Sequence, residues 1–151
     1  MNKTLNFSPS HSENHFAVLN QVGLIEFSGE ERESYLQGQV TCDVINCPNN
    51  QWIFGAHCDA KGKVFSVFRL VKTDNKIFLI TTLDSAKQSI EQFKKFAVFS
   101  KTDIQLLANT CIYISASSDL VKNALDYDSL PDANQVSEEQ NNLLLNLGND
   151  W

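Results

Sequence analysis

The sequence lacks an apolar run long enough to cross a membrane, and it lacks a secretory leader. None of its 151 residues belongs to an apolar stretch that approaches the roughly eighteen residues of a membrane span. Residues 1–15 are rich in Ser, Asn and His and contain no apolar signal core. These absences predict a cytoplasmic protein without membrane contact, and residues 1–15 are predicted to form a flexible N-terminal arm.

The sequence also lacks the residue spacings of a metal site. None of the four cysteines forms a CxxC pair, and no histidine stands at zinc-finger spacing. His11 and His15 are four residues apart, but their surroundings do not have a helical pattern. We therefore predict no metal site and expect the cysteines to be free thiols that pack as small apolar residues.

An excess of basic charge is absent as well. Twelve Lys and Arg stand against 18 Asp and Glu, which gives a net charge of −6 and disfavours a broad nucleic-acid surface. Residues 94–101, KKFAVFSK, are the local exception. They can be interpreted as a small basic patch or as a helix end whose lysines favour the negative end of the helix dipole, and the second interpretation is preferred.

Two alternating apolar runs joined by a turn form the most informative stretch, HCDAKGKVFSVFRL at residues 57–70. Residues 59–62 predict a β-hairpin turn, in which Gly62 can take a positive φ. The following strand is mostly apolar on both faces, which predicts a central strand covered on both sides. Ser66 and Arg69 are its polar exceptions, and a guanidinium buried there requires an anion or carbonyl partners.

The rest of the chain alternates strand and helix patterns. One helix is expected to begin at a Ser28–Glu31 capping box and to end at Gly38. A second is expected to be capped by Asp84 or Ser85, with an inward stripe of Ala86, Ile90, Phe93 and Ala97. The predicted fold class is α+β, an antiparallel or mixed sheet with helices packed on one face. Its strands are expected at residues 16–20, 24–27, 52–58, 64–71, 76–82 and 104–107.

The last third of the chain predicts only half of a further α+β layer. A strand at 111–115, a helix at 118–126, a solvated loop at 127–140 and a strand at 142–147 would leave an unpaired sheet edge. We expect a flexible arm at 1–15, a first α+β domain at 16–107 and the truncated start of a second unit at 108–151. The open edge would then be covered by missing C-terminal domains or by a partner.

A second polar stretch, YLQGQVTCDV at residues 35–44, interleaves hydrogen-bonding side chains with apolar ones. On its own it is typical of a polar loop after a glycine helix end. Together with HCDAKGKVFSVFRL and KKFAVFSKTDI, in this order, it resembles the N-terminal part of the YgfZ-type folate-binding proteins, relatives of the glycine-cleavage T-protein, an aminomethyltransferase. The resemblance covers residues 16–107 closely.

The resemblance implies an aminomethyltransferase-like folate-binding domain and tetrahydrofolate as the cofactor. It further implies support of iron–sulfur enzymes, including those that thiolate tRNA, with those enzymes as partners and no direct contact with nucleic acid. The positions that it marks for folate binding are Val22, Gln39, Asp43, Ser66, Arg69 and Leu70. For Arg69, a carboxylate of the folate glutamate tail and a structural pairing with Asp43 or Asp59 both remain open.

Three departures from the family pattern limit what the resemblance implies. The Lys-Gly-Cys-x-x-Gly-Gln-Glu signature is absent. The tryptophan with which other members contact folate would fall near Val22, so this sequence has no indole there. Ser66 or Val67 stands where the T-protein has its catalytic aspartate, so no catalytic residue is assigned. We expect a non-catalytic or weakly catalytic folate-binding accessory protein. The alternatives are an aminomethyltransferase-like enzyme and a truncated paralogue that acts only as a binding or structural module.

Overall fold

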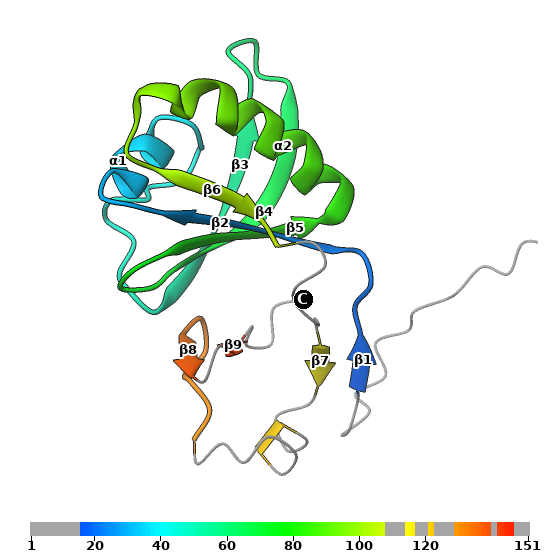
Figure 1. The fold of residues 1–151 in the computed structure, drawn as a ribbon. Coiled ribbons are helices and arrows are strands. Elements are labelled where there is room, and N and C mark those ends of the chain that lie inside the picture. The colour runs from blue at the N-terminus through cyan, green and yellow to red at the C-terminus, as the bar shows by residue number, and fades with distance from the viewer. Residues whose placement is uncertain (1–15, 108–113, 117–120, 123–128, 140–141, 147–151) are drawn as a thin grey trace, which may run out of the picture.

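The central feature of the fold is a five-stranded antiparallel sheet with the longer helix on one face (Figure 1). The computed structural model describes residues 16–107, 114–116, 121–122, 129–139 and 142–146. In spatial order the strands are β3 (Gln51–Cys58), β4 (Val64–Lys72), β5 (Ile77–Thr82), β2 (Val22–Ser28) and β6 (Asp103–Leu106). The helices are α1 (Arg32–Gln37) and α2 (Leu83–Phe96), followed by the short turn η1 (Ala97–Phe99). The predicted α+β class is confirmed.

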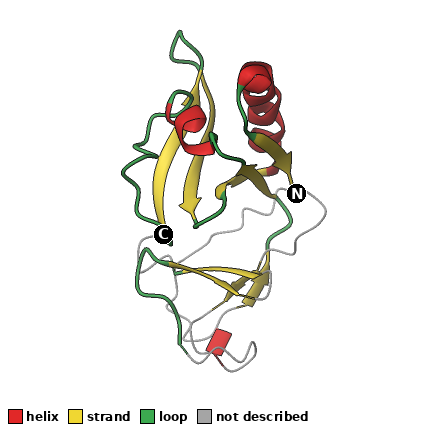
Figure 2. Cartoon of the chain, turned by 60° about the vertical axis from the view of Figure 1, so that its left-hand side comes forward, coloured by secondary structure: helices red, strands yellow, loops and turns green. Residues whose placement is uncertain are grey.

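Strand β4 follows the period-two pattern of its sequence. Ser66, Phe68 and Leu70 are buried on the face covered by α2. Val67 and Arg69 point to the other face, because successive side chains of a strand alternate. The main core lies between the sheet and α2, which stands beside the strands in Figure 2, and it contains Ile25, Phe27, Leu70, Leu79, Ile90 and Phe93.

The outer face of the sheet is only half covered, which corrects the prediction that β4 is covered on both sides. Val71, Trp52 and Phe78 pack under the hairpin of β8 (Val136–Glu139) and β9 (Asn142–Leu145). At the other end of the same face, Val67 is 63% exposed and Phe54 is 58% exposed. The β8–β9 hairpin is too short to cover the whole outer face. The alternating pattern of β4 shows which side chains face outward, but it does not show how much of that face another element covers.

The hairpin β8–β9 also corrects the prediction of a solvated loop over residues 127–140. Val136 pairs with Leu145 and is buried against Trp52. The Trp52 indole Nε1 donates to the Asn146 carbonyl oxygen at 3.1 Å, and Gln51 forms a bridge with Gln135. The polar residues after Pro131 therefore lead into a strand, because contacts with β3, which is distant in the sequence, stabilise it.

Two short strands that flank the main sheet in the sequence form a two-stranded ribbon, drawn below the sheet in Figure 1. Strand β1 (Phe16–Val18) pairs antiparallel with β7 (Ile114–Ala116). The arm at 1–15 and most of the predicted helix at 118–126 lie outside the described residues. In the part of the chain that the structure describes, no helix combines the length and apolar character needed to cross a membrane.

Helix α1 does not use the predicted capping box. Ser28 remains in β2, and Gly29 makes the turn with a φ of +100°. Glu31 is the N-cap residue without a side-chain cap bond, and its carboxylate accepts instead from the Lys101 backbone N at 2.9 Å. The predicted box was wrong because the residue before the turn is needed for pairing with β6 at Asp103.

The N-cap of helix α2 lies two residues before Asp84 and three before Ser85, the two predicted caps. Thr82 is the N-cap, and its Oγ1 accepts from the Ser85 backbone N at 3.4 Å. Thr82 is also the last residue of β5, so its extended backbone already has the conformation that an N-cap requires. The inward stripe is confirmed, with Ala86, Ile90 and Phe93 buried and Ala97 partly buried.

Close approach of α2 to β2 depends on Gly23. A Cβ atom at this position would lie 2.5 Å from the Ala86 Cβ and 3.0 Å from the Leu83 Cα. Real atoms do not approach this closely, so a side chain here forces the helix away from the sheet.

We expect Gly23→Ala to lower the free energy of unfolding by about 2 kcal/mol, since overpacking a close-packed contact costs about 1–3 kcal/mol. Urea unfolding followed by circular dichroism measures the change. The double variant Gly23→Ala/Ala86→Gly restores the space, and it should recover part of the loss despite the lower helix propensity of glycine. Equal stability of Gly23→Ala and the parent chain would contradict the close approach.

Candidate functional site

The six positions predicted to bind folate are distributed over three parts of the fold. Val22 and Arg69 lie on the outer face of the sheet, the face opposite α2. Gln39 and Asp43 lie in the loop between α1 and β3. Ser66 and Leu70 lie on the inner face. The structure therefore does not bring the six side chains together around one surface.

Ser66 and Leu70 are part of the core under α2. Leu70 is 0% exposed and Ser66 is 3% exposed. The Ser89 hydroxyl of α2 donates to the Ser66 hydroxyl oxygen at 2.8 Å, which satisfies both polar groups inside the core. Neither side chain reaches the surface that carries Arg69, so we build the candidate site without them.

Asp43 shapes its own loop. Its carboxylate accepts from the Asn46 side-chain Nδ2 at 2.7 Å and from the Asn46 backbone N at 3.2 Å. These hydrogen bonds hold the pKa of the Asp43 carboxyl below its usual range. Gln39 is half-buried beside this loop, where its backbone N donates to the Leu36 carbonyl at 2.9 Å.

Two side chains outside the predicted set hold the same loop in place. The Gln37 Oε1 accepts from the backbone N of Val44 at 2.7 Å and of Ile45 at 3.1 Å. The buried Lys72 ammonium lies 2.8 Å from the Glu33 carboxylate and donates to the Val44 carbonyl at 3.4 Å. These contacts fix the backbone of the loop between α1 and β3 at Val44 and Ile45.

Arg69 has an unusual environment on the outer face. The guanidinium carbon lies 5.4 Å from the centroid of the Trp52 ring and 5.0 Å from the centroid of the Phe54 ring. Trp52 and Phe54 meet edge to face at 5.2 Å. The Arg69 Nε is buried without a hydrogen-bond partner. Among the described residues, no carboxylate pairs with this cation.

The predicted structural pairing of Arg69 with Asp43 or Asp59 is therefore wrong. Asp43 is engaged with Asn46, and the Asp59 Oδ1 accepts from the backbone N of Lys61 at 2.8 Å and of Lys63 at 2.9 Å. Both carboxylates serve local turns, because an aspartate readily bonds backbone N–H groups two to four residues onward.

The outer-face site, which we define by Trp52, Phe54, Val67 and Arg69, combines a cation with apolar surface. Phe54 lies directly opposite Arg69 in the β3–β4 pairing, and Val67 is exposed next to it. A guanidinium beside aromatic rings can bind a carboxylate, while the exposed Phe54 ring is available to contact a planar group; the Trp52 ring is buried and supports Arg69 from below. Sequence reasoning missed Trp52 and Phe54, whose i, i+2 spacing on the neighbouring strand was the available signal.

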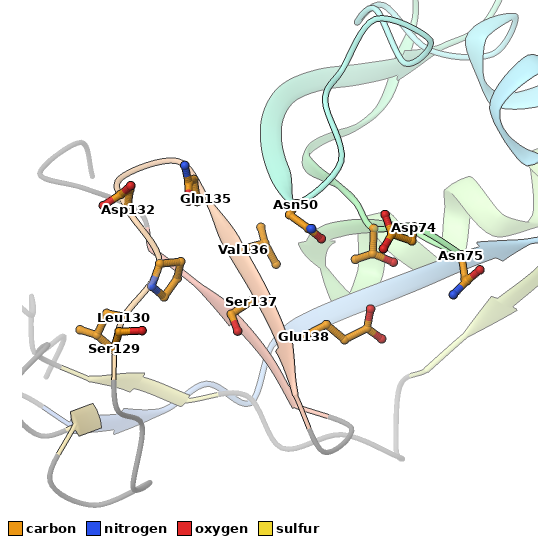
Figure 3. Close-up of a pocket in the computed structure, with 12 residues that line it drawn as sticks. Asn50, Asp74, Asn75, Ser129, Leu130, Asp132, Gln135, Val136, Ser137 and Glu138 are labelled. Atoms are coloured by element: carbon orange, nitrogen blue, oxygen red, sulfur yellow. The ribbon is translucent and has the colours of Figure 1, made fainter.

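A separate cleft of about 580 Å³ lies between the β4–β5 turn and the β8–β9 hairpin (Figure 3). Its lining is mainly polar and includes the carboxylates of Asp74, Asp132 and Glu138. Asp74 is already bonded, since its Oδ1 accepts from the Asn49 side chain at 2.8 Å. Among the described residues, no group of three or more His, Cys, Asp or Glu side chains is arranged to hold a metal ion.

The three described cysteines, Cys42, Cys47 and Cys58, are free thiols, as the sequence predicted. Burial raises the pKa of the Cys42 and Cys47 thiols, which disfavours the reactive thiolate. Cys42 packs against Gly55, where a Cβ atom would lie 2.5 Å from the Cys42 Sγ. These thiols behave as packing groups.

Comparison with known proteins gives a consistent result for the sequence and the fold. The chain is 47% identical over 94 residues to the tRNA-modifying protein YgfZ of Colwellia psychrerythraea, a match that covers 62% of this chain and 29% of that protein. The protein of the same name from Hamiltonella defensa is 36% identical over 131 residues, which cover 84% of this chain and 39% of the relative. The resemblance to the YgfZ-type proteins is confirmed. No family model matches the chain.

The fold of the chain is similar to part of a solved aminomethyltransferase. The glycine cleavage system aminomethyltransferase T of Bartonella henselae superimposes with a TM-score of 0.74 at 13% identity, over 84% of this chain and 36% of that one. The matches span 29% and 39% of the length of the two YgfZ relatives.

Proposed function

We propose that this chain is a folate-binding module that uses the outer-face site and has no catalytic carboxylate. The observation that carries the proposal is the Arg69 guanidinium, which is flanked by two aromatic rings and has no carboxylate partner among the described residues. A folate offers what this surface lacks, because its glutamate tail carries carboxylates and its ring system is planar. Val22 and Gln39 remain predicted contacts.

The wider role is part of the same proposal, and the resemblance to the YgfZ-type proteins supports it. The YgfZ relatives are named as tRNA-modifying proteins. We propose that a folate-loaded protein of this type supports iron–sulfur enzymes in the cytoplasm and affects tRNA modification through them. The net charge of −6 supports an indirect effect, since direct binding to tRNA needs clustered basic residues.

Calorimetric titration with tetrahydrofolate under reducing conditions tests the binding site. We expect Arg69→Met to raise the Kd about 10-fold, because loss of one charge-assisted contact costs about 1.4 kcal/mol. Lys61→Met is the matched control, since Lys61 is an exposed cation in the β3–β4 turn, and it should leave the Kd unchanged. Heat indistinguishable from dilution into buffer, for the parent chain, would contradict the proposal.

Aminomethyl transfer is the second candidate, and the fold of the T-protein is the observation that favours it. Such transfer needs a carboxylate near the folate nitrogen. Ser66 is buried under α2 and Val67 has no ionisable group, so neither residue supplies one. Any folate-dependent methylene transfer by the purified chain would establish this second function. A binding or structural module without folate is the outcome if both tests are negative.

A further inference from the structure

Trp52 connects the outer-face site to the β8–β9 hairpin. Its indole ring is buried, and the ring Nε1 donates to the Asn146 carbonyl oxygen at 3.1 Å. That carbonyl also accepts from the Asn134 backbone N at 3.0 Å, so the indole binds at the open end of the hairpin. The Arg69 guanidinium carbon lies 5.4 Å from the centroid of the same ring. One side chain therefore contacts both the hairpin and the cation of the site.

The position of Arg69 depends on aromatic rings, because polar groups do not fix it. The Arg69 Nε is buried without a hydrogen-bond partner, and among the described residues no carboxylate pairs with the guanidinium. An arginine side chain has many rotamers, so the groups packed against it decide where its cation lies. The Phe54 ring is largely exposed, whereas the Trp52 ring is held in the core. Trp52 is therefore the fixed neighbour of the guanidinium.

The hairpin in turn holds the Trp52 ring. Val136 of β8 is buried in one cluster with Trp52, and its backbone N donates to the Asn50 carbonyl at 2.9 Å. The Trp52 backbone N donates to the Asn134 carbonyl at 3.3 Å. If the hairpin leaves the sheet, the indole loses both its apolar cover and the acceptor of its Nε1–H. The placement of Arg69 is thus linked to the docking of an element that does not carry the cation.

We propose that Trp52 is a positioning residue for Arg69, and that docking of the β8–β9 hairpin thereby raises the affinity of the outer-face site for a carboxylate ligand. The change in affinity rests on the proposed function, whereas the placement of Arg69 is measurable without a ligand. Coupling between two sites is reciprocal, so a bound ligand stabilises the docked hairpin by the same factor. The hairpin then regulates a site that it does not line.

The arginine Nε–H signals in nuclear magnetic resonance spectra test the placement in the free chain. The sequence has two arginines, Arg32 and Arg69, so Arg69→Lys assigns the two signals by the loss of one. We expect Trp52→Leu to shift the Arg69 signal and to speed its exchange with water at least about 10-fold, because the ring that shields the Nε–H is removed. Trp52→Phe keeps a ring and should move the signal less.

Arg32 provides an internal control in the same spectra. Its Nε is also buried, but its guanidinium donates to the Asp74 carbonyl at 2.9 Å and to the Gly29 carbonyl at 3.1 Å. The Arg32 signal should therefore stay in place in every Trp52 variant. An Arg69 signal that Trp52→Leu leaves unchanged in position and exchange overturns the proposal.

Val136→Ser tests the hairpin without changing the site. A hydroxyl in place of this buried side chain weakens docking, and faster exchange of the Trp52 Nε1–H, which bonds to Asn146, measures the release. The Arg69 signal should move as it does in Trp52→Leu. Val18→Ser is the matched control, because Val18 is 52% exposed on β1, and it should leave both signals in place. Release of the indole with an unchanged Arg69 signal would refute the link to the hairpin.

Calorimetric titration with tetrahydrofolate tests the change in affinity. We expect Val136→Ser to raise the Kd at least about 5-fold, the lower end of typical coupling between sites, and Val18→Ser to leave it unchanged. Equal Kd values for Val136→Ser and the parent chain contradict the coupling and leave the folate proposal intact. A parent chain that gives no binding heat contradicts the proposed function instead, and the Arg69 spectra then decide the role of Trp52.

Discussion

Phe93→Ala is expected to lower the free energy of unfolding by about 4 kcal/mol, within the 3–5 kcal/mol typical of a fully buried phenylalanine. Phe93 is 0% exposed at the centre of the α2 interface. Its ring stacks on the His57 ring with centroids 3.9 Å apart, and it meets the Phe27 ring edge to face at 5.1 Å. Truncation to alanine leaves a cavity between the sheet and the helix, which a close-packed core closes only in part.

The chain supplies a matched control six residues later. Phe99→Ala removes the same atoms from a side chain that is 99% exposed, so its free energy of unfolding should remain within about 0.5 kcal/mol of the parent value. Urea unfolding followed by circular dichroism compares the two variants. Similar losses for Phe93→Ala and Phe99→Ala would show that the α2 interface is not the main core.

Stability is expected to fall as the pH is lowered from about 6.5 toward 4, because of His57. Burial between the Phe93 and Phe65 rings lowers the pKa of this histidine to about 4. The unfolded chain binds a proton near pH 6.5, whereas the folded chain does not, so protons favour unfolding in this interval. A difference of about 2.5 pKa units corresponds to at most about 3 kcal/mol.

His57→Phe isolates the contribution of this imidazole. The variant keeps a ring against Phe93 and loses no hydrogen bond at Nδ1, which has no partner among the residues that the structure describes. Its unfolding free energy should vary much less between pH 6.5 and 5.5, an interval in which few carboxylates change charge because their usual pKa values lie near 4. Thermal unfolding across that range measures the slope. A parent chain with a flat profile would contradict a buried neutral histidine.

Local patterns were sufficient to predict most of the main sheet and its helix. The alternation in β4 and the stripe of Ala86, Ile90 and Phe93 in α2 each depend on a single repeated spacing, and both are present in the structure. The same alternation already separates Ser66 and Leu70 from Arg69, because residues of different parity face opposite sides of a strand. The family resemblance assigned all three residues to one folate site, whereas the structure places them on opposite faces of the sheet.

Features that depend on distant parts of the chain were not accessible from the sequence. The partners of Trp52 come from the β8–β9 hairpin, more than eighty residues later. A strand was predicted at the position of β9, but acidic and amide residues predicted a loop in place of β8. Thr82 caps α2 because, as the last residue of β5, it already has the extended backbone conformation of an N-cap residue. The flanking of Arg69 by two rings required the register of β3 against β4, which no local pattern specifies.

The loop that follows α1 has a further consequence for the edge of the sheet. The Thr41 backbone N donates to the Ala56 carbonyl at 3.0 Å, and the Ala56 backbone N donates to the Thr41 hydroxyl at 2.9 Å. Val40 forms a bridge with His57 beside them. The Ala56 backbone groups that a strand from another molecule could engage are therefore already occupied. At this position the loop blocks edge-to-edge pairing along β3, whatever ligand the sheet face binds.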